Sequence, residues 1–218
     1  MQKKIIGFDL DGVLIDSLPV MEIAWHECMN KLGIKEEFVN YKKHIGKPFI
    51  DIMNILGLID YMPEIKYLYD QKCIENIELI NVFPGIANIL MYFNSLDSCF
   101  VSIVTSKTKA RAEHIVDKLN LVSDILITPE DCSKGKPNPD PLLKLNRHFD
   151  VRPNSNSSIY IGDMNSDYRS AKSANWHYVN VSWGYGEIID KNEMEYYSCA
   201  NINQVSELKR YLSKWLIA

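Results

Sequence analysis

Four aspartates lie in two short clusters, and each cluster directly follows a β-branched, apolar run. Asp9 and Asp11 form the first cluster, and Asp163 and Asp167 lie in the second. Carboxylates repel one another and are poor strand formers, so clusters at the ends of two buried strands indicate a shared cation rather than a packing role. Oxygen ligands without a His or Cys cluster suit Mg²⁺, which usually binds one or two carboxylates together with water and phosphate oxygens. These residues predict an enzyme that binds a hard metal ion together with a phosphate group.

Three further residues are candidates for contacting that phosphate. Lys136 lies in a turn-rich loop, where its ammonium would relieve the repulsion between the carboxylates and hold a phosphoryl oxygen. Thr105 ends another apolar run and could donate its hydroxyl to the same group. Gly12 follows the first acids, and its lack of a side chain would let backbone amides approach the phosphate closely.

The elements that must position these residues alternate between strand and helix patterns. Apolar runs of strand length occupy residues 5–10, 100–105, 124–128, 158–162 and 177–183, and stripes of helical period lie near residues 86–93, 112–119 and 142–149. This alternation is typical of an α/β fold in which a mostly parallel sheet is covered on both faces. Ligands bind beyond the carboxyl ends of such strands, so Asp9, Thr105 and Asp163 should face one crevice.

One interval interrupts the alternation. From about residue 16 to about residue 80 the pattern is helical, without a strand, and helices are expected over residues 18–32, 48–57 and 63–79. Pro and Gly punctuate both ends of the interval, at residues 16–19 and 81–85, which would serve as hinges. We therefore expect a three-layer, Rossmann-like parallel-sheet core formed by residues 1–15 and 81–218, with an inserted α-helical cap of residues 16–80.

The composition excludes several other classes of protein. The chain has 218 residues, of which 46% are hydrophobic and 24% charged, and its formal net charge is -4. This mild acidity argues against a nucleic-acid partner, and no apolar stretch approaches the ~18 residues of a membrane span. Five cysteines without a Cys-x-x-Cys pair indicate neither a disulfide framework nor a zinc site. We expect a cytoplasmic protein with no nucleic-acid partner, no membrane attachment and no obligate protein partner.

Four motifs, in order, resemble those of the haloacid dehalogenase superfamily. They are residues 9–17 (Asp-Leu-Asp-Gly-Val-Leu-Ile-Asp-Ser), Thr105 within Val-Thr-Ser, the Lys136-Pro137 pair, and residues 162–167 (Gly-Asp-Met-Asn-Ser-Asp). The resemblance covers essentially the whole chain. The helical insertion after the first motif is similar to that of phosphoglycolate phosphatase-like and β-phosphoglucomutase-like members.

The resemblance implies a division of roles among the clustered acids. Asp9 would be the nucleophile that forms an aspartyl-phosphate, and Asp11 would protonate the leaving alkoxide and later activate water. Mg²⁺ would be held by the Asp9 carboxylate, the Asp11 main-chain oxygen and the Asp163 carboxylate. Asp167 would brace this shell or its bound water.

The resemblance also implies contacts to the phosphate and to the rest of the substrate. Thr105 and Lys136 would steady the transferring phosphoryl group, with Ser106 as a weaker candidate. In the cap, Lys47 would read a remote anion of the substrate, because the family places specificity residues in this region. Lys107, by contrast, is expected to lie in a solvated helix start.

Together these expectations define a hydrolase that uses Mg²⁺ to cleave a small phosphomonoester, either phosphoglycolate or a sugar phosphate. Two alternatives stay open. A phosphosugar mutase would use the same motifs but return the phosphoryl group to a bound sugar, and a catalytically silent binding module would keep the fold without turnover. Residues 183–186 (Trp-Gly-Tyr-Gly) resemble a loop of phosphoglycolate phosphatase-like members, which favours the phosphatase. This loop could border the site, or its aromatic side chains could belong to the core.

Overall fold

The chain forms two compact units in a computed structural model that describes residues 3–186 and 199–218. One unit comprises residues 1–15 together with 82–218, and the other comprises residues 16–81. The chain passes between the units through β2 (Ile15–Asp16) and β3 (Asn81–Val82), which pair as a two-stranded sheet.

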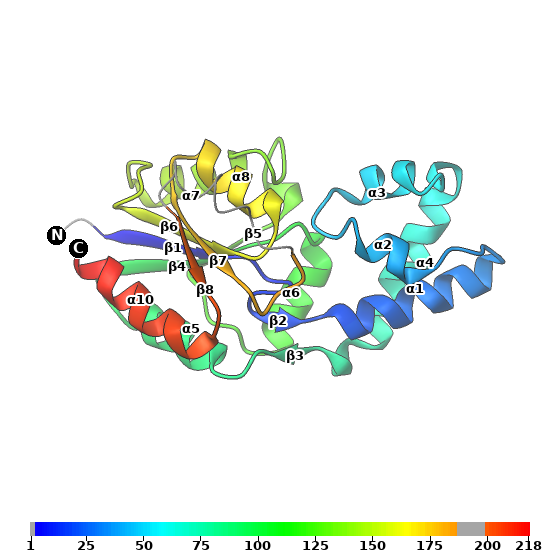
Figure 1. The fold of residues 1–218 in the computed structure, drawn as a ribbon, viewed down its shortest axis with the longest axis horizontal. Helices are drawn as coiled ribbons and strands as arrows, with labels where there is room; N and C mark the ends of the chain where they lie inside the picture. The colour runs from blue at the N-terminus through cyan, green and yellow to red at the C-terminus, as the bar shows by residue number, and fades with distance from the viewer. Residues whose placement is uncertain (1–2, 187–198) are drawn as a thin grey trace. The chain divides into compact units, whose positions relative to one another are not determined.

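The larger unit contains a parallel sheet of six strands in the order β5-β4-β1-β6-β7-β8 (Figure 1). The strands are β1 (Lys4–Phe8), β4 (Cys99–Val104), β5 (Ile125–Ile127), β6 (Ser158–Gly162), β7 (His177–Val181) and β8 (Cys199–Ile202). All five neighbouring pairs run parallel. The interior strands β1, β6 and β7 are almost wholly buried, which explains their mainly apolar sequences.

The five strands expected from the sequence are present, and the α/β fold class is confirmed. The additional strand β8 was missed, because three of its four residues are not fully buried and its short sequence, Cys-Ala-Asn-Ile, has no apolar run. Its pairing with β7 extends the sheet at that edge.

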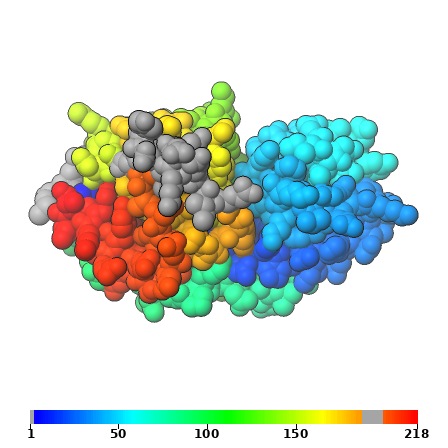
Figure 2. All heavy atoms as spheres, viewed as in Figure 1, coloured from blue at the N-terminus to red at the C-terminus, as the bar shows by residue number. Residues whose placement is uncertain are grey.

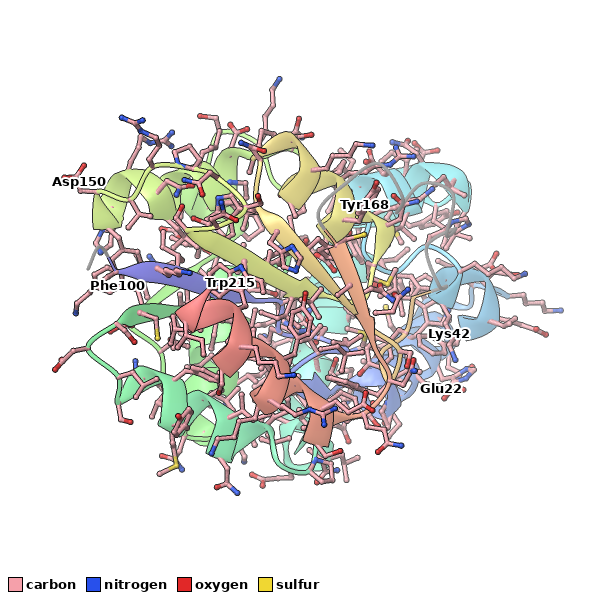
Figure 3. All side chains as sticks on the ribbon, turned by 60° about the vertical axis from the view of Figure 1, so that its left-hand side comes forward. Glu22, Lys42, Phe100, Asp150, Tyr168 and Trp215 are labelled. Atoms are coloured by element: carbon pink, nitrogen blue, oxygen red, sulfur yellow. The ribbon has the colours of Figure 1, made fainter. Side chains whose placement is uncertain are left out.

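Helices cover both faces of this sheet. The helices are α5 (Ile86–Asn94), α6 (Lys109–Lys118), α7 (Asp140–Phe149), α8 (Asn165–Ser173) and α10 (Val205–Ile217), with a short 3₁₀ turn, η3 (Pro129–Asp131). Helices α7 and α8 pack on one face and α5, α6 and α10 on the other (Figure 1), so that Tyr168 and Trp215 lie on opposite sides of the sheet (Figure 3). On the surface α10 lies beside α5 (Figure 2), where the Lys209 ammonium sits 3.9 Å from the centre of the Tyr92 ring.

Between β2 and β3, the regular elements of the smaller unit are helices. Its elements are α1 (Leu18–Leu32), α2 (Phe38–Lys42), α3 (Phe49–Ile55), η1 (Ile59–Tyr61), α4 (Met62–Glu75) and η2 (Ile77–Leu79). Helix α1 ends where Gly33 takes a left-handed conformation, at φ 67°. The Trp25 ring lies 4.5 Å from the Tyr41 ring and 6.4 Å from the Tyr69 ring, which joins α1, α2 and α4 in one core.

The three helices expected in this interval are present, with two differences. Helix α2 was missed, because five residues are too few to show a helical period. The third expected helix ends at Glu75, and the chain continues through Asn76 into the separate turn η2. In the described part of the chain, no helix combines the length and the apolar character that a membrane crossing requires.

Candidate active site

The acids and their neighbours meet because their strands are adjacent in the sheet. In the parallel register, Phe8 of β1 lies between Ile103 of β4 and Ile161 of β6. The residues that follow these three positions therefore leave the sheet at the same carboxyl edge. The Asp9 N–H still donates to the carbonyl of Ile161, at 2.9 Å, so Asp9 occupies the last rung of the ladder.

Asp9, Asp163 and Asp167 form a buried cluster of acids. Each offers a carboxylate oxygen within 4.8 Å of the others. One oxygen of Asp163, Oδ2, accepts hydrogen bonds from the Tyr185 N–H at 2.6 Å and the Gly186 N–H at 3.3 Å. The other oxygen, Oδ1, is buried without a hydrogen-bond donor among the described residues. A buried carboxylate oxygen without a donor is what a hard cation would bind.

Lys136 reaches into this cluster from the loop before α7. Its ammonium lies 2.7 Å from Asp9 Oδ1 and 2.7 Å from Asp167 Oδ1, and it donates to the hydroxyl of Tyr160 at 3.0 Å. Tyr160, a residue of β6 that the sequence analysis did not single out, donates in turn to the carbonyl of Val104 at 3.0 Å. The Lys136 ammonium is thus held by three side chains, those of Asp9, Asp167 and Tyr160.

The ionisation of these groups reflects both burial and their mutual charges. Burial raises the pKa of Asp9 well above its usual range, against the opposing effect of the Lys136 ammonium. Burial and the nearby Asp167 raise the pKa of Asp163 to about 7. Burial alone would lower the pKa of Lys136, but the carboxylates of Asp167 and Asp9 hold it well above the usual value. Three carboxylates and one ammonium carry a formal charge of −2, which is the charge that a divalent cation would neutralise.

Asp167 is already engaged at both of its oxygens. Oδ1 contacts Lys136, and Oδ2 accepts a hydrogen bond from the Met164 N–H at 3.0 Å, which caps α8. This arrangement fits a residue that braces the cluster better than one that supplies a free ligand oxygen.

Gly12 has a steric role that the sequence analysis did not predict. Its N–H donates to the carbonyl of Ile15 at 2.9 Å, within its own loop, so this amide is committed there rather than offered to a phosphate. Its φ of 80° is one that residues with side chains rarely adopt, and a Cβ here would collide with the Asp163 carboxylate. Glycine is therefore required so that the two acid clusters can approach each other.

The segment after β4 places three consecutive residues differently. Thr105 is buried, and its Oγ1 accepts a hydrogen bond from the Lys107 N–H at 3.1 Å, whereas Ser106 is exposed. The expectation that Lys107 is solvated was wrong. Its side chain is 4% exposed and its Nζ lies 3.2 Å from Asp11 Oδ1. Its position directly beyond a strand end was the signal that could have revealed it, because the carboxyl edge of the sheet gathers such residues.

The loop of residues 183–186 borders the acid cluster. Besides the two amides that bind Asp163, the Trp183 indole N–H donates to the carbonyl of Val13 at 3.2 Å, and the Tyr185 hydroxyl donates to the carbonyl of Ile15 at 3.3 Å. The loop therefore ties the first acid motif to the second.

Lys47 belongs to the smaller unit. It is an exposed residue just before α3, and its N–H donates to the carbonyl of His44 at 3.1 Å. Because its side chain is exposed, Lys47 does not take part in packing the helical core.

Comparisons with known proteins agree with this geometry. The sequence model of the family described as "Haloacid dehalogenase-like hydrolase" matches residues 6–181. A phosphoglycolate phosphatase of Nitrosococcus oceani is 25% identical over 225 residues, covering 98% of each chain, and one of Aquifex aeolicus is 26% identical over 186 residues, covering 84% of this chain and 86% of the relative. A solved structure of a haloacid dehalogenase-like family hydrolase from Streptococcus pneumoniae has a TM-score of 0.79 at 21% identity, covering 96% of this chain and 99% of that one, and so shows a shared fold. Because the family match spans most of the chain and its four motifs, this protein belongs to the haloacid dehalogenase-like hydrolase family.

Proposed function

We propose that the protein is a Mg²⁺-dependent phosphatase that hydrolyses a small phosphomonoester through an aspartyl-phosphate on Asp9. The observation that carries this proposal is the buried acid cluster, in which Asp163 Oδ1 lacks a donor among the described residues and Lys136 offsets only part of the negative charge. A divalent cation and a phosphoryl group are the ligands that such a site would bind together.

The residues present fit a Mg²⁺ ion. The carboxylates of Asp9 and Asp163 and the main-chain oxygen of Asp11 would hold it, and Asp167 would brace them through Lys136 and the start of α8. When bound, the ion supplies positive charge that offsets the charge of the phosphoryl oxygens and of the acids themselves.

Phosphoryl transfer would proceed in two balanced steps. A carboxylate oxygen of Asp9 attacks phosphorus, the bond from phosphorus to the substrate oxygen breaks, and Asp11 donates a proton to that oxygen, so that an alcohol leaves. A water molecule then attacks the same phosphorus and gives a proton to Asp11, which releases inorganic phosphate and restores the Asp9 carboxylate. Lys136 and the Thr105 hydroxyl, with Ser106 beside them, would hold the phosphoryl oxygens during both steps.

Phosphoglycolate is the first substrate to test, because two relatives that align over most of the chain carry the name phosphoglycolate phosphatase. A sugar phosphate is the second. The smaller unit would serve as the cap, excluding bulk water from the aspartyl-phosphate, and Lys47 would bind a remote anion such as the glycolate carboxylate.

A panel of phosphorylated metabolites, read out as released inorganic phosphate, tests the proposal. We expect turnover that requires Mg²⁺, that is abolished in Asp9→Asn, and that is highest for a small phosphomonoester. Activity unchanged by Asp9→Asn would refute the assignment of the nucleophile. Isomerised sugar phosphate without free phosphate, in the presence of a sugar bisphosphate primer, would identify a mutase instead, and absence of turnover on every ester would identify a silent binding module.

A further inference from the structure

We propose that Lys107 is a positioning residue for Asp11, and that its ammonium holds the Asp11 carboxyl group where, in its protonated form, it can give its proton to the leaving oxygen of the substrate. This inference rests on the proposed function. It concerns a residue that the sequence pattern had assigned to solvent and that the structure places beside the second acid of the first motif.

The contact between the two side chains is short and shielded from water. Lys107 Nζ lies 3.2 Å from Asp11 Oδ1, and the two side chains are 4% and 16% exposed. A buried ammonium loses its hydration, so it depends on its ionic partner far more than a surface lysine does. Lys109, two residues further on, offers the contrast: its side chain is 50% exposed and its Nζ lies 3.5 Å from Asp131. Water therefore weakens the ion pair of Lys109 with Asp131 much more than the ion pair of Lys107 with Asp11.

Both ends of the contact stand on rigid backbone. Lys107 follows β4, and its N–H donates to Thr105 Oγ1 at 3.1 Å, which sets the turn that brings the lysine back toward the sheet. Asp11 follows β1, the neighbour of β4, and it forms a bridge with Ile15 while Gly12 closes the loop. Because neither backbone segment is a long flexible loop, the ion pair fixes the direction of the Asp11 carboxylate.

The two acids of the first motif, Asp9 and Asp11, thus contact different lysines. Lys136 contacts Asp9 and Asp167, and Lys107 contacts Asp11. Among the described residues, the acids with carboxylate oxygens within 4.8 Å of one another are Asp9, Asp163 and Asp167, and Asp11 is not one of them. The Asp11 carboxyl group thus lies outside this cluster of acids and has its own contact to Lys107.

The experiment varies how much the leaving group needs a proton. Phenyl phosphate, 4-nitrophenyl phosphate and 2,4-dinitrophenyl phosphate have similar shapes and no second anion, but their leaving groups become progressively better. The quantity measured is kcat/KM, because in a double-displacement reaction it reports the steps up to departure of the leaving group and not the later attack of water. Asp11→Asn calibrates the series, since loss of the acid should matter most for phenyl phosphate.

Lys107→Met should lower kcat/KM for phenyl phosphate by about 10- to 100-fold and for 2,4-dinitrophenyl phosphate by less than about threefold. The loss should lie in kcat, with KM nearly unchanged. Lys107→Arg should restore most of the rate, and Lys109→Met should match the wild type across the series. Lys107→Gln, which keeps a polar side chain, repeats the comparison if Lys107→Met folds poorly, and thermal unfolding of each variant identifies such a case.

Three results would overturn the inference: equal losses for all three esters, no loss for any of them, or a loss confined to phosphoglycolate. The last of these, seen as a higher KM, would mean that Lys107 binds the carboxylate of the substrate rather than Asp11. If Asp11→Asn itself shows no dependence on the leaving group, the proposed acid role of Asp11 fails. If Asp11→Asn shows the dependence and the Lys107 variants do not, only the role of Lys107 fails.

Discussion

Replacement of Lys136 by methionine removes a buried ammonium that two buried carboxylates share. Lys136 Nζ lies 2.7 Å from both Asp9 Oδ1 and Asp167 Oδ1, and all three side chains are at most 9% exposed. Removing one partner of a buried ion pair costs about 3–5 kcal/mol, because the remaining charge is left without compensation. Domains of this kind are stable by only about 5–15 kcal/mol, so Lys136→Met should remove a large part of the free energy of unfolding.

This loss of stability should depend on pH, because the carboxylates of Asp9 and Asp167, left without the ammonium, can take up protons. Burial raises the pKa of Asp9 even when Lys136 is present, and loss of the ammonium raises it further. A carboxyl whose folded-state pKa lies above its unfolded value contributes full stability below the unfolded pKa, and it loses that stability as the pH rises through the folded pKa. Lys136→Met should therefore cost about 3–5 kcal/mol near pH 8 and clearly less near pH 5.5.

Urea unfolding in the presence of EDTA, at both pH values, measures this difference. Lys109→Met is the matched control: its side chain is 50% exposed, so its ion pair with Asp131 is screened by solvent and its loss should cost less than about 1 kcal/mol at either pH. The reasoning is refuted if Lys136→Met costs less than about 1 kcal/mol near pH 8, or if its cost is the same at both pH values.

Three further outcomes follow from the site. The pKa of Asp163 is raised to about 7, so the stability of the metal-free protein should be greatest below that pH and fall as the pH rises through it, and Mg²⁺ should flatten this trend in thermal unfolding. Gly12→Ala should cost about 1–2 kcal/mol of stability from its positive φ and should also weaken Mg²⁺ binding in calorimetry, because the new Cβ displaces Asp163. Gly33→Ala, with a φ of 67° and open space around it, should cost similar stability and leave Mg²⁺ affinity unchanged; equal metal affinity in both variants would contradict the packing argument. Lys47→Ala should raise KM for phosphoglycolate and leave 4-nitrophenyl phosphate unaffected, and equal effects on both esters would remove Lys47 from substrate recognition.

Local patterns were sufficient for most of the secondary structure. The strands β1, β4, β5, β6 and β7 are short apolar runs, and α1, α5, α6 and α7 show apolar stripes of helical period. Both patterns depend on residues within a few positions of one another. Two elements without such a pattern were missed: α2, whose five residues are too few to show a helical period, and β8, whose four residues contain no apolar run.

The sequence predicted those residues of the candidate site that lie directly beyond the end of a strand. Acids directly beyond β1 and β6 and the threonine beyond β4 must reach one edge of a parallel sheet, whichever strands are neighbours. Tyr160 was not predictable in this way, and for Lys107 the strand-end signal competed with that of an ordinary helix start. A lysine at a helix start and a tyrosine in an apolar run each have a common structural explanation, and only their neighbours in space give them another.

The sequence by itself determined the class of fold, the positions of most helices and strands, the four motifs and the family that they identify, because these depend on residue type and spacing along the chain. The tertiary structure decided which charges meet. The order of the sheet places β1 between β4 and β6, and this adjacency pairs Lys107 with Asp11, seats Lys136 between Asp9 and Asp167, and requires glycine at residue 12 so that Asp163 can approach. Electrostatic energies and steric contacts depend on distances in space, and residues that are far apart along the chain acquire those distances only when the sheet is assembled.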